Sequence, residues 1–305
     1  MRDHEHFFTV SGGIFTTRGN THPSGFVHAA GVYRPSGNGE KEFEGKKYTK
    51  EVDDFGNKWV KEINPDYVKE EGPNSYILVP EKDIIKIFNP FENSVKIQEK
   101  ISDTKWNAVL EELKKVVPKE DIGFIGSYLI GFPNENSDLD IVIRGKDNLI
   151  RVKSSFQQIV NNLNAKNSVD ERIMQVSLDK YYKMHNEKNN DFRKMVERRW
   201  PTIRTNDFMM KIRFTCGDKE ENFMTKKELN EDFLCSGVVT DDTGTAFMPR
   251  EFKIETEEGI YRVLTYFWNY TYCVSNGDKL DVRAAKIGEN LLIIKNRDKH
   301  GIKFR

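Results

Sequence analysis

The sequence contains little cysteine. Its three thiols, Cys216, Cys235 and Cys273, stand far apart, and no pair has the spacing of a metal-binding CxxC motif. An odd number of widely separated cysteines is typical of free, reduced thiols. The cysteine content therefore argues against a disulfide-stapled secreted scaffold and predicts a cytoplasmic protein.

Long apolar runs are missing as well. No stretch approaches the roughly 20 apolar residues that a membrane-spanning helix needs. The first ten residues, MRDHEHFFTV, carry charged groups and histidines where a secretory signal would have an apolar segment. We therefore expect no signal peptide and no membrane partner.

The chain has no net charge, because 48 Lys and Arg balance 48 Asp and Glu. This balance argues against a protein that is held on nucleic acid mainly by bulk charge, although a local basic patch remains compatible with it. The stretch from Lys279 to Arg305 has eight basic and three acidic residues. It follows an aromatic-rich run, Tyr261 to Tyr272. This region is therefore the candidate contact for RNA or another nucleic acid.

Three regions differ in their residue patterns. Residues 1–98 are rich in glycine, proline and short alternating runs, which predicts a small, mostly β domain. Residues 99–228 combine helical and strand patterns and form the predicted core domain. Residues 229–305 contain short apolar runs separated by turn residues, which favours a small β barrel or sandwich. The predicted fold class is α+β.

The core region has two segments with helical spacing, in which apolar residues recur every three or four positions. The first begins after Asp103 and ends at Pro118, and the second begins at Asp147, so we expect both aspartates to be N-caps. The apolar positions of the first helix are Trp106, Val109, Leu110, Leu113 and Val117. Strands are expected at IGFI, DLDIVI and FMMKIRFTC.

Asp138 and Asp140 stand one residue apart at the beginning of the apolar run LDIVI. Residues two apart in a strand share one face, so the two carboxylates would point the same way. Two like charges this close repel each other unless a cation relieves them. A solvated turn is the simpler interpretation of the pair by itself, and a Mg²⁺ site is the functional one.

The segment IGSYLIGFPNENSDLDIVIRG, residues 125–145, resembles the signature of the DNA polymerase β-type nucleotidyltransferase superfamily. That signature is an apolar residue, Gly-Ser, about ten residues, and then Asp-x-Asp between apolar residues. The matching positions are Gly126, Ser127, Gly131, Ser137, Asp138 and Asp140. The segments HPSGFVHAAGVYRP and VVTDDTGTAFMP are similar to flanking parts of a group of archaeal and bacterial predicted nucleotidyltransferases.

The resemblance implies a nucleotidyltransferase core between two small, mostly β domains. It implies a transferase of the EC 2.7.7 type that moves a nucleoside monophosphate from a nucleoside triphosphate, such as ATP, to an acceptor hydroxyl. Asp138 and Asp140 would be catalytic and would bind Mg²⁺, with Mn²⁺ as an alternative. The nucleotide would contact the remaining matched residues, Gly126, Ser127, Gly131 and Ser137.

The superfamily usually has a third carboxylate on a later strand. In this sequence the corresponding strand has Lys211 among apolar residues, and Asp207 stands four residues earlier. We expect Lys211 to bind nucleotide and to lie within ion-pair reach of Asp138 or Asp140. The alternative function is therefore a degenerate member that binds nucleotide or nucleic acid without transfer. Ile130 also replaces a basic residue that many members have before the glycine matched by Gly131.

Overall fold

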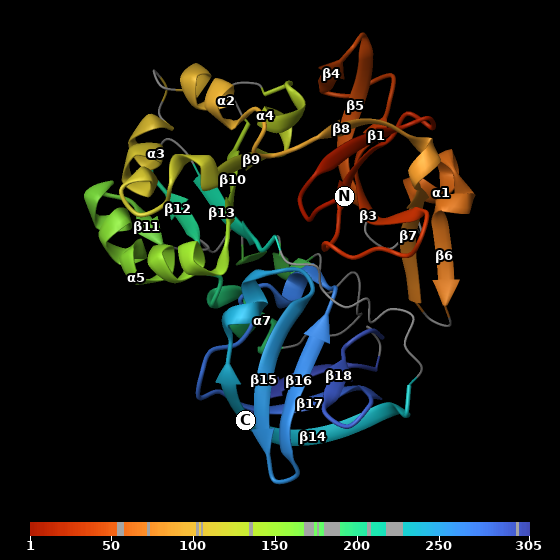
Figure 1. The fold of residues 1–305 in the computed structure, drawn as a ribbon, viewed down its shortest axis with the longest axis vertical. Helices are drawn as coiled ribbons and strands as arrows, with labels where there is room; N and C mark the ends of the chain where they lie inside the picture. Colours follow the sequence, from red (N-terminus) through yellow and green to blue (C-terminus); the bar gives the residue numbers. More distant parts are fainter. Residues whose placement is uncertain are drawn as a thin grey trace. The chain divides into compact units, whose positions relative to one another are not determined.

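A computed structural model describes residues 1–53, 58–71, 74–101, 104, 106–133, 137–167, 174–175, 177–179, 190–205, 209–217, 228–296 and 299–305. The chain has a mixed α and β fold and packs as two compact units (Figure 1). Unit 1 comprises Met1–Lys166 with Ile203–Asn222, and unit 2 comprises Asn167–Thr202 with Phe223–Arg305. Our three-domain division stays a prediction, because compact packing does not show which segments fold independently.

The N-terminal part of unit 1 is an eight-stranded antiparallel sheet. Its strands are β1 (His6–Thr9), β2 (Ile14–Thr17), β3 (Phe26–Pro35), β4 (Lys41–Phe43), β5 (Lys46–Asp53), β6 (Val68–Glu71), β7 (Asn74–Pro80) and β8 (Ile84–Phe88). The order is β4-β5-β3-β2-β1-β8, and β7 joins β6 to the first half of β3. The long strand β3 therefore pairs with β7 near its beginning and with β5 near its end.

One face of this sheet is covered by the short helix α1 (Trp59–Ile63) and the 3-10 turn η1 (Pro65–Tyr67). Trp59 is fully buried there. A Cβ atom on Gly31 would lie 2.4 Å from the Trp59 ring, so only glycine allows the indole to pack against β3. A further 3-10 turn, η2 (Glu81–Asp83), joins β7 to β8.

The second sheet contains five strands in the order β11-β12-β13-β10-β9. They are β9 (Ile122–Ile125), β10 (Leu139–Arg144), β11 (Lys166–Asn167), β12 (Thr202–Arg204) and β13 (Met209–Thr215). Strand β10 runs antiparallel to β9 and parallel to β13. The three strands expected in the core region are therefore present and adjacent.

The helices of this part are α2 (Ser94–Ile101), α3 (Asn107–Lys114), α4 (Ser127–Ile130) and α5 (Lys146–Asn162), with the 3-10 turn η3 (Lys119–Asp121). All five apolar positions expected for the first helix are buried, although α3 itself is shorter than the predicted span. Asp103 lies outside the described residues. The prediction of Asp147 as an N-cap is wrong, because α5 begins after Gly145 and Asp147 lies inside its first turn. A carboxylate there still interacts favourably with the helix dipole.

An aromatic cluster joins the N-terminal sheet to α4. The Phe132 ring, just after α4, lies 4.9 Å from the Tyr33 ring at an interplanar angle of 86°. It also lies 6.3 Å from the Phe43 ring, and Leu129 and Ile130 of α4 are buried in the same cluster. Edge-to-face ring contacts of this kind add to the stabilisation from apolar burial.

Unit 2 contains a closed β barrel. Its strands are β14 (Asn230–Asp241), β15 (Arg250–Thr256), β16 (Gly259–Thr265), β17 (Lys279–Ile287) and β18 (Leu291–Ile293), with β19 (Gly301–Phe304) added to β17 and the 3-10 turns η4 (Thr243–Ala246) and η5 (Trp268–Tyr270) in the loops. The order is β14-β15-β16-β18-β17, and pairing of β14 with β17 closes the ring. Among the described strands of this barrel, only β16 and β18 pair in parallel, which is the strand arrangement of an OB-fold barrel.

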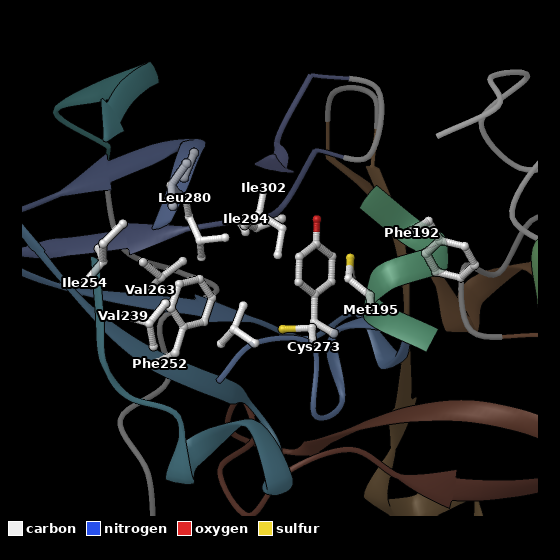
Figure 2. Close-up of a cluster of buried hydrophobic side chains, with 14 of the residues drawn as sticks. Phe192, Met195, Val239, Phe252, Ile254, Val263, Cys273, Leu280, Ile294 and Ile302 are labelled. Carbon is white, nitrogen blue, oxygen red and sulfur yellow. The ribbon is translucent and has the colours of Figure 1, made fainter. Parts of the chain in front are cut away.

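The barrel core also contains side chains from α7 (Asn190–Glu197). Phe192 and Met195 of this helix lie in one cluster with Phe252, Val263 and Leu280 of the barrel strands (Figure 2). The helix precedes the barrel in the sequence by more than 30 residues, so it packs as part of unit 2. Among the described residues, no helix combines the length and apolar character that crossing a bilayer requires.

We predict that Phe132→Ala destabilises unit 1 by about 3–5 kcal/mol, because it leaves a cavity between α4 and the N-terminal sheet. Urea unfolding measures the change. Ile150→Ala, at a position 59% exposed on α5, is the control and should change stability by less than about 0.5 kcal/mol. Equal effects of the two substitutions would contradict the packing described here.

Candidate active site

The two aspartates stand at the beginning of β10. Leu139 between them is fully buried, whereas Asp138 is exposed and Asp140 is half-buried. This alternation follows from strand geometry, in which neighbouring side chains point to opposite faces. The carboxylates therefore project from one side of the strand, while Leu139 holds that strand in the core.

The Gly-Ser pair lies directly beside Asp140. Strand β9 runs antiparallel to β10, and Ile125, the residue before the pair, is the register partner of Asp140. Gly126 has φ 68° and ψ −141°, a conformation that is strained for any residue with a side chain. A Cβ atom at this position would lie 3.6 Å from Asp140 Oδ2, in ordinary van der Waals contact, so the Gly126 backbone lies close to the carboxylate.

The turn that follows is the single-turn helix α4, and local hydrogen bonds hold its shape. The Ser127 carbonyl accepts hydrogen bonds from the backbone N–H groups of Gly131 and Phe132, both at 3.0 Å. Gly131 has φ 99°, a left-handed conformation that ends the helix. Gly126, Ser127 and Gly131 thus belong to one compact turn at the Asp140 side of the sheet.

Ser137 precedes the first aspartate and is buried, with 9% exposure. Its Oγ accepts a hydrogen bond of 3.0 Å from the Lys41 ammonium of β4. The N-terminal sheet therefore reaches the residue next to Asp138.

Lys211 is the register partner of Asp140 on the parallel strand β13. Burial lowers the pKa of the Lys211 ammonium, and the negative charges of Asp140 and Asp138 oppose this change. The expected direct ion pair is wrong, because among the described residues no Lys211 ammonium–carboxylate distance to either aspartate falls within 4.0 Å. The three groups share an electrostatic environment without direct contact.

The third carboxylate is not supplied by β13 at the position beside Asp140. Within the part of the chain that the structure describes, no group of three His, Cys, Asp or Glu side chains is arranged to hold a metal ion. Asp207, the other candidate on this segment, lies outside the described residues. The described site is thus a pair of carboxylates with a lysine beside the second one.

Four residues of the N-terminal sheet that sequence reasoning missed also lie near this site: His6, Tyr33, Lys41 and Lys50. Burial lowers the pKa of His6 to about 4, so the imidazole is neutral at pH 7, and the Asp140 charge opposes the shift. Burial raises the pKa of the Tyr33 hydroxyl, and Asp140 adds to that increase. These residues have no local motif, so no sequence signal connected them with Asp140.

Residues 106–201, about a third of the chain, match the family model described as a nucleotidyltransferase domain. The chain therefore carries such a domain, and its resemblance to the polymerase β-type superfamily is confirmed. The match contains the Gly-Ser pair and both aspartates but ends before Lys211. Neither the curated proteins nor the solved structures contain a match to this chain.

Nucleotidyltransferase domains generally use divalent metals. The chemistry of the two aspartates fits such an ion, because Mg²⁺ prefers oxygen ligands and is commonly held by one or two carboxylates together with phosphate oxygens and water. Gly126 brings no side chain against Asp140 Oδ2, which is compatible with further ligands on that oxygen. The residues present therefore fit a divalent metal bound together with a phosphate group.

We predict that Gly126→Ala impairs nucleotide binding and lowers stability by about 1–3 kcal/mol, because alanine is strained at this backbone conformation and its methyl group enters the space beside Asp140. Mn²⁺-dependent binding of a fluorescent ATP analogue and urea unfolding measure the two effects. Gly37→Ala is the control, since nothing lies within 4 Å of a Cβ there and its φ is ordinary. Unchanged binding by the Gly126 variant would contradict this assignment.

Proposed function

We propose that this protein transfers a nucleoside monophosphate from a nucleoside triphosphate to an acceptor hydroxyl in a Mg²⁺-dependent reaction. The observation that carries the proposal is the position of Gly126 against Asp140, with 3.6 Å between the glycine's Cβ position and the carboxylate. The Gly-Ser turn and the Asp140 carboxylate thus lie next to each other, as a site that binds a phosphate through a metal ion requires.

Asp138 and Asp140 would hold the metal, which would supply charge neutralisation at the transferred phosphoryl group and acidify the attacking hydroxyl. The backbone of Gly126 and Ser127 can approach phosphate oxygens closely because glycine has no side chain. The Ser127 hydroxyl supplies a further hydrogen-bond donor. Ser137 and Gly131 support the same turn and strand, and Lys211 offers a positive charge to the nucleotide.

Binding of nucleotide without transfer is the second candidate function. The observation that favours it is the register of Lys211 with Asp140, at the point where a carboxylate could share a metal with the pair. A lysine ammonium cannot bind a metal ion or accept a proton. Lys211 therefore supports nucleotide binding more readily than removal of the proton from the acceptor hydroxyl. The two functions predict opposite effects of Lys211→Asp on the transfer activity.

The acceptor could be an RNA end, a protein side chain or a small metabolite. The outward residues of β15 and β16 do not favour nucleic acid, since Arg262 is paired with Glu251 at 2.9 Å and Lys253 with Asp241 at 3.2 Å. On OB-fold barrels, these two strands commonly form the nucleic-acid-binding face. RNA binding through the C-terminal region remains a proposal that rests on its basic tail and aromatic residues.

We predict that Asp138→Asn and Asp140→Asn each abolish Mg²⁺-dependent nucleotide binding, because the amide removes a charged metal ligand of similar size. Isothermal titration with MgATP and with Mn²⁺ measures the loss. Asp147→Asn, in the exposed first turn of α5, is the control and should bind normally. Both site variants should retain the wild-type melting temperature in chelator, and a large drop there would mean that the pair is structural.

We predict that Lys211→Asp lowers Mg²⁺-dependent nucleotidyl transfer at least tenfold, because the substitution replaces a positive charge near the phosphates by a negative one. Transfer of label from each α-labelled nucleoside triphosphate to total RNA or to lysate protein measures the activity. Lys211→Met separates the loss of positive charge from the gain of a carboxylate. An increase in transfer by Lys211→Asp would instead establish the second function, a site that had lost its third carboxylate.

A further inference from the structure

One face of the N-terminal sheet points toward the aspartate pair. Tyr33, Phe43 and Tyr48 lie on this face and share a buried cluster with α4 and Phe132. Because side chains alternate along strands, Lys41 lies on the same side of β4 as Phe43, and Lys50 on the same side of β5 as Tyr48. Lys41 and Lys50 therefore lie on the face of the sheet that packs against α4.

Lys41 reaches the site directly. It pairs in register with Tyr48, and its ammonium donates a hydrogen bond of 3.0 Å to Ser137 Oγ, one residue before Asp138. Desolvation lowers the pKa of Lys41, the nearby Lys50 charge lowers it further, and Glu40 opposes the change. The hydrogen bond fixes the Lys41 ammonium at Ser137, the residue next to Asp138 in the sequence.

Lys50 lies on β5, on the same face of the sheet as Lys41 and Tyr48. It is the register partner of Tyr33, whose ring packs on Phe132. Its side chain is exposed, and among the described residues its ammonium has no carboxylate within 4.0 Å. The charge of Lys50 contributes to lowering the pKa of Lys41, His6 and Lys211, so it lies near all three groups.

We infer that Lys41 and Lys50 of the N-terminal sheet bind the triphosphate of the nucleotide, so that this sheet forms one wall of the active site. The inference rests on the proposed function and extends it to residues outside the matched domain. The Lys50 charge acts on both the Lys41 and the Lys211 ammonium groups, so three positive charges lie close enough to influence one another. Like charges held together repel, and an anion relieves that repulsion.

The position before Gly131 gives this inference a structural reason. Ile130 occupies it and is buried against the N-terminal sheet, so α4 itself offers no positive charge to a phosphate. The same apolar contact includes Phe43 of β4 and Tyr48 of β5, the strands that carry Lys41 and Lys50. Lysine ammonium groups are suited to phosphate as mobile point charges, and a contact with an ionised partner is stronger than a neutral hydrogen bond.

The test uses inorganic tripolyphosphate, titrated calorimetrically into the full-length protein in chelator, where the carboxylates hold no metal. Lys41→Ala and Lys50→Ala should each weaken binding about tenfold, the loss expected for one charge-assisted contact, and the double variant should weaken it further. Lys47→Ala, on the opposite face of β5 from Lys50, is the matched control and should bind as the wild type does. Lys50→Arg retains the charge and should restore most of the affinity.

The outcomes separate this inference from the proposed function. If wild type binds MgATP through Asp138 and Asp140 but the lysine variants bind tripolyphosphate and MgATP unchanged, the inference is overturned and the proposed function stands. If the lysine variants lose tripolyphosphate while no variant or wild type transfers nucleotide, the inference stands and the transfer activity fails. Wild type that binds no tripolyphosphate in chelator also overturns the inference.

Discussion

The antiparallel pairing of β9 with β10 is the interaction on which the site depends. It makes Ile125 the partner of Asp140 and so brings the next residue, Gly126, against that carboxylate. The pairing is held in place by the buried side chains Phe124, Leu139 and Ile141, which leave the opposite face of β10 to the aspartates. A one-residue slip in this register would turn both aspartates into the core, where unpaired charges are costly.

The second constraint is the apolar contact between α4 and the N-terminal sheet. Leu129, Ile130 and Phe132 bury one side of the Gly-Ser turn, so the turn has a single orientation relative to β3, β4 and β5. In the same sheet, Lys41 of β4 donates a hydrogen bond to Ser137, and burial keeps His6 of β1 neutral. The N-terminal sheet thus contributes both apolar packing on α4 and polar contacts next to the aspartate pair.

Much of the local structure was predictable from the sequence. The spacing of Val109, Leu110 and Leu113 predicted a helix, and the alternation around Leu139 predicted a strand whose aspartates share a face. The prediction of an N-cap at Asp147 was wrong because the N-cap is the residue at which the backbone enters the helix. That residue is Gly145. The prediction of a direct ion pair between Lys211 and an aspartate was wrong. Strand register determines which residues are neighbours, but it does not determine where the ammonium of a flexible side chain lies.

The sequence by itself determined the chemical groups and their local order: a Gly-Ser turn, two carboxylates on one strand face, and a lysine on a later strand. These features depend on backbone periodicity over a few residues, which the sequence records directly. Only the tertiary structure decided that Lys41, almost 100 residues before Asp138, contacts Ser137 beside that aspartate. Contacts between distant segments arise from burial of apolar faces such as that around Phe132, and no local pattern records which faces will meet.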